Sequence, residues 1–341
     1  MQNISDKFKE QLNKGNRNYN AYVDITLSDG TVLNITNSDI WQGSFSIEDS
    51  VSGDSEFQIG SAIINKFSVS LNNIEEKFSK YDFYDSKAAV YIGMEFEDGT
   101  VEKIKKGVFN ADEVKHNGEL VSLTYLDNMA KFQKEYSESK LQYPATRAAI
   151  LRDACENCGV ILKTVTFDGS DLVVQSRPSD EALTFQQVVA WVAQLSCKWA
   201  RCDKDGQLEL IWCDQENLLS GEPDEKSYHN IDASHLIGAP SVEESDVEVT
   251  GVKVIPTEGD SVGFYGETGY VLSVEQNDLI EESDVHTIAS ALGQKLIGLK
   301  FRPMDASSLS NPAIEAGDIM IVTNRKGSVY RGIITSTVFS L

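Results

Sequence analysis

The sequence predicts a mainly β protein in which two small β-barrel-like domains are joined by an α+β domain. Three observations support this fold class. Asp-Gly and Asn-Gly pairs separate short β-forming runs early in the chain, apolar residues at helical spacing gather in its middle, and strand-like runs return towards its end. The predicted parts are an N-terminal helix or arm at 1–20, a first β-barrel-like domain at 21–140, an α+β insert domain at 141–240, and a second β-barrel-like domain with one helix at 241–341.

The N-terminal segment predicts a short amphipathic helix. Ile4, Phe8 and Leu12 recur at helical spacing in MQNISDKFKEQLNKGNRNY and form one apolar stripe. The segment has no apolar signal core, and no apolar run in the chain approaches the ~20 residues needed to cross a bilayer. We therefore expect a protein that starts in a cytoplasm and is not inserted in a membrane.

The first β-barrel-like domain is predicted from hairpin signals. Ser-Asp-Gly at 28–30, Glu-Asp-Gly at 97–99 and Asn-Gly at 117–118 each lie between two β-forming runs. These residues tolerate the positive φ angles that tight hairpin turns require. The run KFSVSLNN alternates apolar and polar residues, as a half-buried strand does. Several short strands at this spacing indicate a compact barrel or sandwich.

Two helices are predicted in the middle of the chain. Pro144 suits the first turn of a helix, which continues through ATRAAILRDACENC and ends at Gly159 as its C-terminal cap. A second helix begins at Thr184, whose hydroxyl can cap it, and Gln187 three residues later completes a capping box. Helices next to hairpin signals indicate an α+β unit.

The remaining elements are a hairpin, a loop and one late helix. Asp-Gly at 205–206 predicts the hairpin, and the polar stretch LLSGEPDEKSYHN at 218–230 predicts the loop. Strand-like runs after residue 240 surround a helix near 284–299, capped by Ser283 and Asp284. Its apolar stripe consists of Ile288, Leu292, Leu296 and Leu299.

The CENCG stretch is the first candidate for chemistry. Leu151, Cys155 and Cys158 fall at i, i+4 and i+7 of the predicted helix, so both thiols lie on its buried face. A redox CxxC needs a helix N-terminus, whereas this pair lies in the last turn. A zinc site needs a second close pair, which the spacing of the other cysteines does not supply. We interpret all five cysteines as core residues, with a metal site and a redox site as the alternatives; the other three are Cys197, Cys202 and Cys213.

No catalytic, cofactor-binding or metal-ligating residue is predicted. The sequence contains no HExxH, P-loop or GxGxxG pattern. The four histidines are scattered, and two of them are expected to be solvated. The three glycines of VGFYGETGY are interpreted as turn glycines, and four nearby carboxylates as chance neighbours in an acidic chain. The histidines are His116, His229, His235 and His286, of which His229 and His235 are the two expected to be solvated. The glycines are Gly263, Gly266 and Gly269, and the carboxylates are Glu243, Glu244, Asp246 and Glu248.

Composition and charge restrict the classes of function. Apolar residues make up 41% of the 341 residues, as in folded proteins. The chain has 53 acidic and 30 basic residues and a formal charge of −23, with the acidic residues spread over its whole length. Such a charge repels the phosphate backbone, so binding of DNA or RNA is not expected. Nothing in the sequence indicates an enzyme.

Specific stretches resemble hub proteins of phage tails. WQGSFSIEDSVSGDSEFQIGSAIINKFSVSLNN is similar to the first barrel of prophage tail proteins, and YPATRAAILRDACENCGV to the helix that follows it. NPAIEAGDIMIV is similar to the turn that opens the last hairpin of the second barrel. In that turn Pro312 fixes the entry, Gly317 supplies a permissive backbone, and Asp318 can accept hydrogen bonds from the turn amides.

The resemblance implies a non-enzymatic structural hub of a tail tip or baseplate, located in the virion tail and assembled in the cytoplasm of a bacterial host. It implies a homotrimeric ring that adapts the tail tube to the tip and contacts the distal tail or tube proteins and the tape-measure protein. DNA passes through such a ring as cargo without being bound. No cofactor or metal is implied.

Two other classes of function remain open at this stage. A tail-tip peptidoglycan hydrolase would need a nucleophile or paired acids in a cleft. A receptor- or glycan-binding tip protein could stack sugars on tryptophans, although three of the four lie on core-like faces of the α+β unit. The tryptophans are Trp41, Trp191, Trp199 and Trp212.

Overall fold

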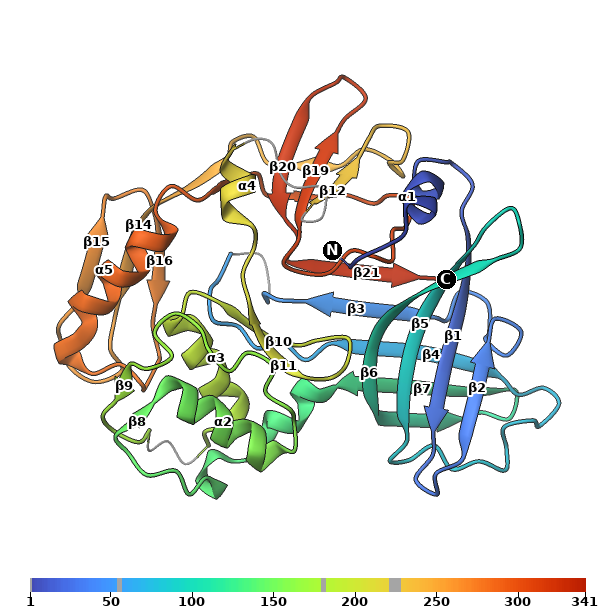
Figure 1. Cartoon of the computed structure of the whole chain (residues 1–341), viewed down its shortest axis with the longest axis horizontal. Coiled ribbons are helices and arrows are strands. Elements are labelled where there is room, and N and C mark those ends of the chain that lie inside the picture. The colour runs from blue at the N-terminus through green and yellow to red at the C-terminus, as the bar shows by residue number, and fades with distance from the viewer. Residues whose placement is uncertain (1, 54–56, 179–181, 221–227) are drawn as a thin grey trace.

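An eight-stranded antiparallel sheet forms one end of the molecule (Figure 1). The computed structural model describes residues 2–53, 57–178, 182–220 and 228–341. The mainly β fold class is confirmed, because strands from several sheets dominate the described residues and helices are few. In pairing order, the strands of the large sheet are β2 (Val32–Thr36), β1 (Asn18–Thr26), β5 (Lys87–Glu95), β6 (Val101–His116), β7 (Leu120–Asp127), β4 (Lys66–Asn72), β3 (Ser46–Ser50) and β21 (Ser336–Ser340).

The predicted hairpins form this sheet. Gly30, Gly99 and Gly118 all have positive φ angles in the turns between paired strands. Alternation in β4 buries Phe67 and its i+2 and i+4 neighbours on one face. β2 and β21 lie at the two ends of the pairing order, and their closure into a barrel stays a prediction.

A β-bulge in β6 directs one lysine out of the regular ladder. Val90 pairs with Gly107, and the next residue, Tyr91, pairs with Lys105, so Lys106 is the extra residue in β6. A bulge bends its strand and redirects a side chain. Sequence periodicity contains no signal for this insertion, which positions Lys106 at the site described below.

The middle region contains α2 (Arg147–Cys158) and α3 (Phe185–Leu195), which pack against each other beneath the hairpin of β10 (Trp199–Cys202) and β11 (Leu208–Ile211) (Figure 1). Both predicted helix boundaries are confirmed at their caps. Gly159 adopts the left-handed conformation after α2, and Thr184 with Gln187 forms the capping box of α3. Short elements complete the region: η1 (Asn128–Gln133), η2 (Tyr136–Glu138), β8 (Ala145–Thr146) and β9 (Val173–Val174).

Two local predictions in this region need correction. Pro144 is not in the first helical turn: it follows a cis peptide bond, and Thr146 is the N-cap of α2. The predicted loop at 218–230 includes the end of α4 (Gln215–Ser220) and most of β12 (Tyr228–Ile231), while 221–227 lies outside the described residues. β12 forms because it pairs in parallel with a strand almost a hundred residues later, which has no local sequence signal.

The last part of the chain contributes to several sheets. α5 (Val285–Leu296) confirms the predicted late helix and packs on two strands, although Asp284 at its N-cap makes no side-chain capping bond and η3 (Glu282–Asp284) precedes it. The strands are β13 (Ser241–Val242), β14 (Val247–Val254), β15 (Gly263–Gly266), β16 (Tyr270–Val274), β17 (Lys300–Phe301), β18 (Met304–Asp305), β19 (Ile319–Thr323) and β20 (Val329–Ile333).

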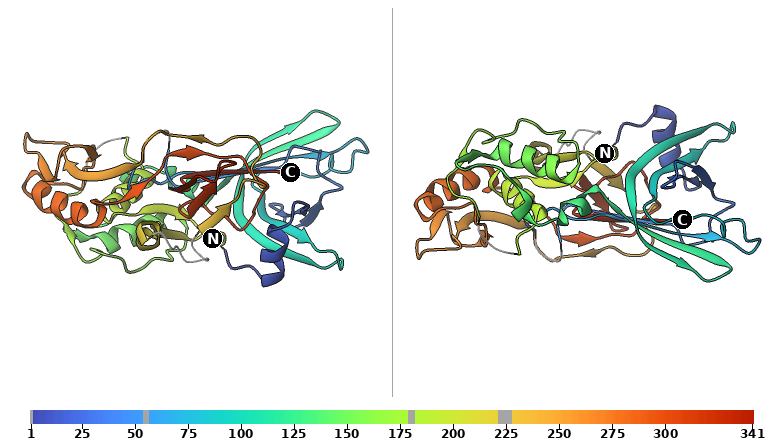
Figure 2. Two further views of the ribbon diagram at one scale, coloured as in Figure 1. Left: turned by 90° about the horizontal axis from the view of Figure 1, so that it is seen from above. Right: turned by 90° about the horizontal axis from the view of Figure 1, so that it is seen from below.

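Two large cores lie side by side in an elongated, flat molecule (Figure 2). One lies within the eight-stranded sheet. The other is continuous from the α2–α3 pair to α5 and β14, and includes Phe57, whose ring packs against Trp199 and Phe301. α1 (Asp6–Leu12) forms the predicted N-terminal helix and buries Phe8 against β5 and β6. None of the described helices is both long and apolar enough to cross a membrane.

Candidate functional site: a buried charge cluster where four segments meet

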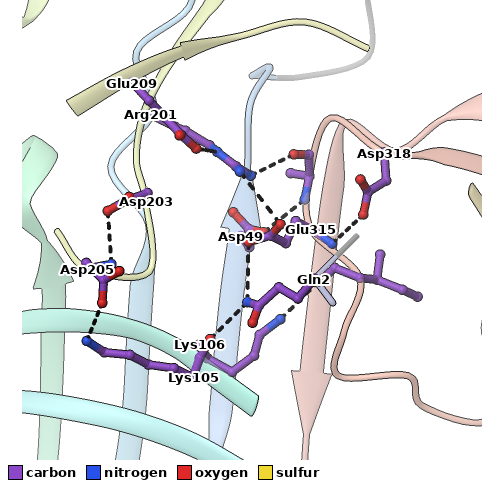
Figure 3. Close-up of polar contacts among 12 residues, drawn as sticks. Gln2, Asp49, Lys105, Lys106, Arg201, Asp203, Asp205, Glu209, Glu315 and Asp318 are labelled. Carbon is purple, nitrogen blue, oxygen red and sulfur yellow. Dashed lines mark hydrogen bonds and ion pairs between the residues drawn. The ribbon is translucent and has the colours of Figure 1, made fainter. Parts of the chain in front are cut away.

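Charged side chains from four distant segments meet between the two cores (Figure 3). β3 contributes Asp49, the bulge of β6 contributes Lys106, and the β10–β11 hairpin contributes Arg201. The turn before β19 contributes Glu315 and Asp318. These residues are the charge cluster, and all of them except Asp318 line a cavity that has about 30 Å³ of internal space.

Lys106 binds the turn before β19 through backbone carbonyls. Its Nζ donates hydrogen bonds to the carbonyl oxygens of Pro312 at 2.8 Å and Ile314 at 2.9 Å. Burial lowers the pKa of Lys106, and the carboxylates of Asp49 and Glu315 oppose that shift. The ammonium group therefore acts as a cross-link between β6 and the turn.

Arg201 connects the hairpin to the same turn. Its Nε donates to Glu209 Oε1 at 2.8 Å, its Nη1 donates to the carbonyl oxygen of Ala316 at 3.0 Å, and its Nη2 lies 3.8 Å from Glu315 Oε2. Burial opposes ionisation of Arg201, but Glu315, Asp49 and Glu209 outweigh burial and raise its pKa. A hydrogen-bonded buried pair of this kind fixes geometry more than it adds stability.

The turn itself is ordered by carboxylates. Asp49 Oδ2 accepts a hydrogen bond from the amide of Ala316 at 2.9 Å, and Asp318 Oδ2 accepts one from the amide of Glu315 at 2.9 Å. Gly317 has a φ of 98°, which explains why glycine is required there. The sequence-based roles of Gly317 and Asp318 are thus confirmed, whereas the partner in β3 had no sequence signal.

Asp127, at the end of β7, lines the same cavity. Its side chain is 5% exposed, and its Oδ1 accepts a hydrogen bond from the amide of Met129 at 3.0 Å. No described residue gives Oδ2 a hydrogen bond. Burial raises the pKa of Asp127 to about 7. This carboxyl therefore changes charge near neutral pH.

The cysteines are buried as the sequence predicted. All five are free, and Cys155 and Cys158 are 3% and 5% exposed. Burial raises the pKa of Cys155 to about 12 and that of Cys158 to about 11, so both remain protonated at neutral pH. Among the described residues, no group of three or more His, Cys, Asp or Glu side chains has an arrangement suited to a metal ion.

The prediction for two histidines is wrong. His229 is half-buried and His235 is 9% exposed, and both line a cavity of about 290 Å³ next to α1. Their acidic surroundings in the sequence predict solvated rings. In the structure His229 Nδ1 lies 3.2 Å from Asn311 Nδ2, 82 positions away, and the carbonyl oxygen of His235 accepts a hydrogen bond from the amide of Leu309. His116 and His286 are exposed.

The prediction of turn glycines in VGFYGETGY is wrong for two of the three. Gly263 and Gly266 lie in β15 and not in a turn. A Cβ at Gly263 would lie 2.1 Å from the carbonyl oxygen of Val285, so glycine is needed for close packing of α5 on the sheet. The acidic group near β14 is partly paired, since Asp246 contacts Arg302 at 2.5 Å and Lys300 at 3.6 Å.

Three of the four tryptophans are wholly or partly buried. Trp199 is 0% exposed and its ring centroid lies 4.4 Å from that of Trp212, while Trp191 is also partly buried. Trp41, in the first region, is 45% exposed. The core-like positions predicted for three of the tryptophans are thus confirmed.

No protein-family model matches the chain, and no curated protein matches its sequence. Solved structures do match. The 43 kDa tail protein of prophage MuSo2 from Shewanella oneidensis has 11% sequence identity and a TM-score of 0.53, with 94% of this chain and 93% of that chain covered. A tail protein from Neisseria meningitidis has 11% identity and a TM-score of 0.55, with coverages of 94% and 92%. The resemblance to phage tail proteins is therefore confirmed at the level of the fold, which this chain shares with both proteins over nearly its whole length.

Proposed function

We propose that this protein is a structural hub of a phage or prophage tail tip or baseplate. The observation that carries the proposal is the fold shared with two tail proteins over 94% of this chain and more than 90% of theirs. A match of that extent concerns the whole architecture and not one common domain. The four-part division at residues 20, 140 and 240 belongs to the same proposal.

The charge cluster supports a structural role for the protein. It joins β3, β6 and the turn before β19 through charged groups that bind each other and the backbone. These groups are already used within the molecule, so the cluster positions segments. We therefore propose a non-enzymatic protein, with no cofactor, in which this junction keeps the two cores in a fixed relation.

In the proposed assembly three copies form a ring that adapts the tail tube to the tip. Three chains with a formal charge of −23 each give −69. At physiological salt, charge on the channel wall repels DNA over a Debye length of ~8 Å. We propose that acidic residues outnumber basic ones on the channel side, so that DNA passes as cargo and is not bound.

The proposed partners are the distal tail or tube proteins and the tape-measure protein. The proposed location is the virion tail, after assembly in the cytoplasm of the bacterial host and without insertion into a membrane. Co-purification of the chain with tail tubes from induced cells, compared with cells in which its gene is deleted, would test these partners.

The mass of the protein in solution is the direct test of the ring. Light scattering after size exclusion should give three times 37.7 kDa, or about 113 kDa, at micromolar concentration. A monomer at every concentration up to the millimolar range, alone and with its tail partners, would contradict the ring. A protein that shifts duplex DNA in a gel at physiological salt would contradict the acidic channel.

The two other function classes have separate tests. A peptidoglycan hydrolase would clear a zone in a cell-wall gel, and a glycan-binding protein would bind sugars through Trp41, the most exposed of its tryptophans. We expect no zone of clearing and no difference on a glycan array between the protein and its Trp41→Ala variant.

A further inference from the structure

A second cavity lies between the N-terminal helix and the last part of the chain. It has a volume of about 290 Å³, near the lower end of small-molecule sites. α1 and the residues just after it form one wall, and β12 with residues 309–311 forms the other. This cavity is separate from the charge cluster, with which it shares no lining residue.

The charge of its lining is opposite to that of the protein. Lys9 and Arg17 line it, and no carboxylate occurs among the described lining residues, although acidic residues outnumber basic ones 53 to 30 in the chain. Lys9 has a weak pairing with Asp6, at 3.5 Å on an exposed surface. A lining without carboxylates in an acidic protein favours an anion.

Arg17 is held in place without neutralisation. Its Nη1 donates to the carbonyl oxygens of Leu309 at 2.9 Å and Ser310 at 2.8 Å, and its Nε donates to that of Lys14 at 3.3 Å. Within the described parts of the chain, no carboxylate lies at ion-pair distance from it. Carbonyl dipoles orient the guanidinium but leave its net charge uncompensated.

His229 adds an unused polar atom. Its Nδ1 lies 3.2 Å from Asn311 Nδ2, while its buried Nε2 has no hydrogen-bond partner among the described residues. Burial lowers the pKa of His229 to about 4, and the positive charges of Arg17 and His235 add to that shift. The Oδ2 atom of Asp232 lies 3.5 Å from Nδ1 of His235.

Part of the remaining cavity lining is apolar and indicates which chemical group the uncharged end of a ligand would carry. Ile4, Leu12 and Leu309 contribute apolar side chains. A hydrated inorganic ion would leave these groups unpartnered, whereas a short hydrocarbon chain would bury them. An organic anion with one apolar end therefore matches both kinds of lining.

We propose that this cavity binds a small organic anion, with its carboxylate near Arg17 and His229 and its apolar part against Ile4, Leu12 and Leu309. A neutral imidazole can donate one hydrogen bond to a carboxylate, and the guanidinium supplies the charge. Several such contacts to a ligand of about six heavy atoms give affinities on the order of millimolar.

Nuclear magnetic resonance of the histidine rings is suited to the test, because the chain contains four histidines. The intact protein labelled at histidine is titrated with sodium butyrate at constant ionic strength, and the signals are assigned with single His→Gln variants. We expect saturable shifts of His229 and His235 and none of His116 and His286, which lie outside the cavity. Equal shifts of all four, or no saturation, would overturn the proposal.

Other probes test the ligand class. n-Butylamine has a similar size but opposite charge, and we expect no saturable shift with it. Inorganic phosphate has the charge without the apolar end, and we expect it to bind at least about fivefold more weakly than butyrate. Equal affinity for phosphate and butyrate would overturn the proposed organic ligand, and binding of butylamine would overturn the anion site.

Two matched variants test whether a positive charge that lines the cavity contributes to butyrate binding. Lys9→Gln removes a lining charge from an exposed position, and we expect about threefold weaker butyrate binding. Lys14→Gln removes an exposed charge just after the same helix, where Lys14 pairs with Glu97 at 3.0 Å and does not line the cavity. Butyrate affinity should be unchanged in this control, and equal losses in both variants would contradict a local site.

Discussion

The Nζ atom of Lys106 donates a hydrogen bond to the carbonyl oxygen of Pro312 at 2.8 Å, across 206 positions of the sequence. The bulge in β6 makes this contact, because it turns the lysine out of the ladder. The pair therefore connects the eight-stranded sheet directly to the turn that begins β19.

Lys106→Met should destabilise the protein. The substitution keeps the aliphatic chain but leaves the carbonyl oxygens of Pro312 and Ile314 without their donor, and Arg201 becomes the remaining cation beside Asp49 and Glu315. We expect a loss of ~2–4 kcal/mol in the free energy of unfolding, measured by urea denaturation. Lys115→Met, at an exposed position of the same strand, should change it by less than ~0.5 kcal/mol. Equal effects would show that the cluster contributes nothing specific.

Asp127→Asn should change the pH dependence of stability. The folded-state pKa of Asp127, about 7, lies above the ordinary value of 3.8, so the folded protein holds a proton that the unfolded chain has lost. Its contribution to stability is complete below pH 4 and decreases as the pH rises through 7. Relative to the wild type, the variant should gain ~1.4 kcal/mol per pH unit between pH 5 and 7.

The control for this experiment is Asp112→Asn, which changes an exposed carboxylate in neighbouring strand β6. Urea unfolding at pH 5, 6 and 7 should give parallel curves for this control and the wild type. Parallel curves for Asp127→Asn as well would contradict a buried, protonated carboxyl.

Gly263→Ala should disturb the packing of α5. The new methyl group would lie 2.1 Å from the carbonyl oxygen of Val285, and this backbone atom can move only if the helix shifts. We expect a loss of ~2–3 kcal/mol, seen as a lower midpoint of thermal unfolding. Gly15→Ala is the matched control, because nothing lies within 4 Å of its added Cβ. A midpoint for Gly263→Ala equal to that of the control would refute the close-packing role.

The double substitution of Cys155 and Cys158 by Ala should leave the fold intact. Both thiols are buried with raised pKa values, so only packing is lost, and we expect a decrease of ~1–2 kcal/mol in the free energy of unfolding. In the native wild type the thiols should react with a disulfide reagent far more slowly than in urea. Stoichiometric zinc in the purified protein, or unfolding by a chelator, would argue against packing as their role.

The sequence predicts elements whose signals are local. The capping box of Thr184 and Gln187, the αL cap at Gly159 and the turn glycines each depend on neighbours a few residues away. Side-chain periodicity likewise identifies the buried face that contains Cys155 and Cys158. These features were predictable because local geometry restricts which residues can occupy them.

The site escaped prediction because its contacts are distant in sequence. Lys106 is one of several lysines in a strand of alternating pattern, and only the bulge distinguishes it. Asp49 and Arg201 appear in sequence as ordinary surface charges. The acidic sequence around His229 predicts a solvated ring, whereas its contact with Asn311 comes from 82 positions away. Such placements require the three-dimensional arrangement.

The pairing of β21 with β3 has a consequence for how the protein is made. Ser50 at the end of β3 faces Ser336 in β21, 286 residues later. While a ribosome synthesises the chain, β3 has its β4 partner long before β21 exists, so its other edge is open for most of translation. Open strand edges attract other nascent chains and favour aggregation. Newly made chains should therefore depend on chaperones that shield this edge until β21 has emerged.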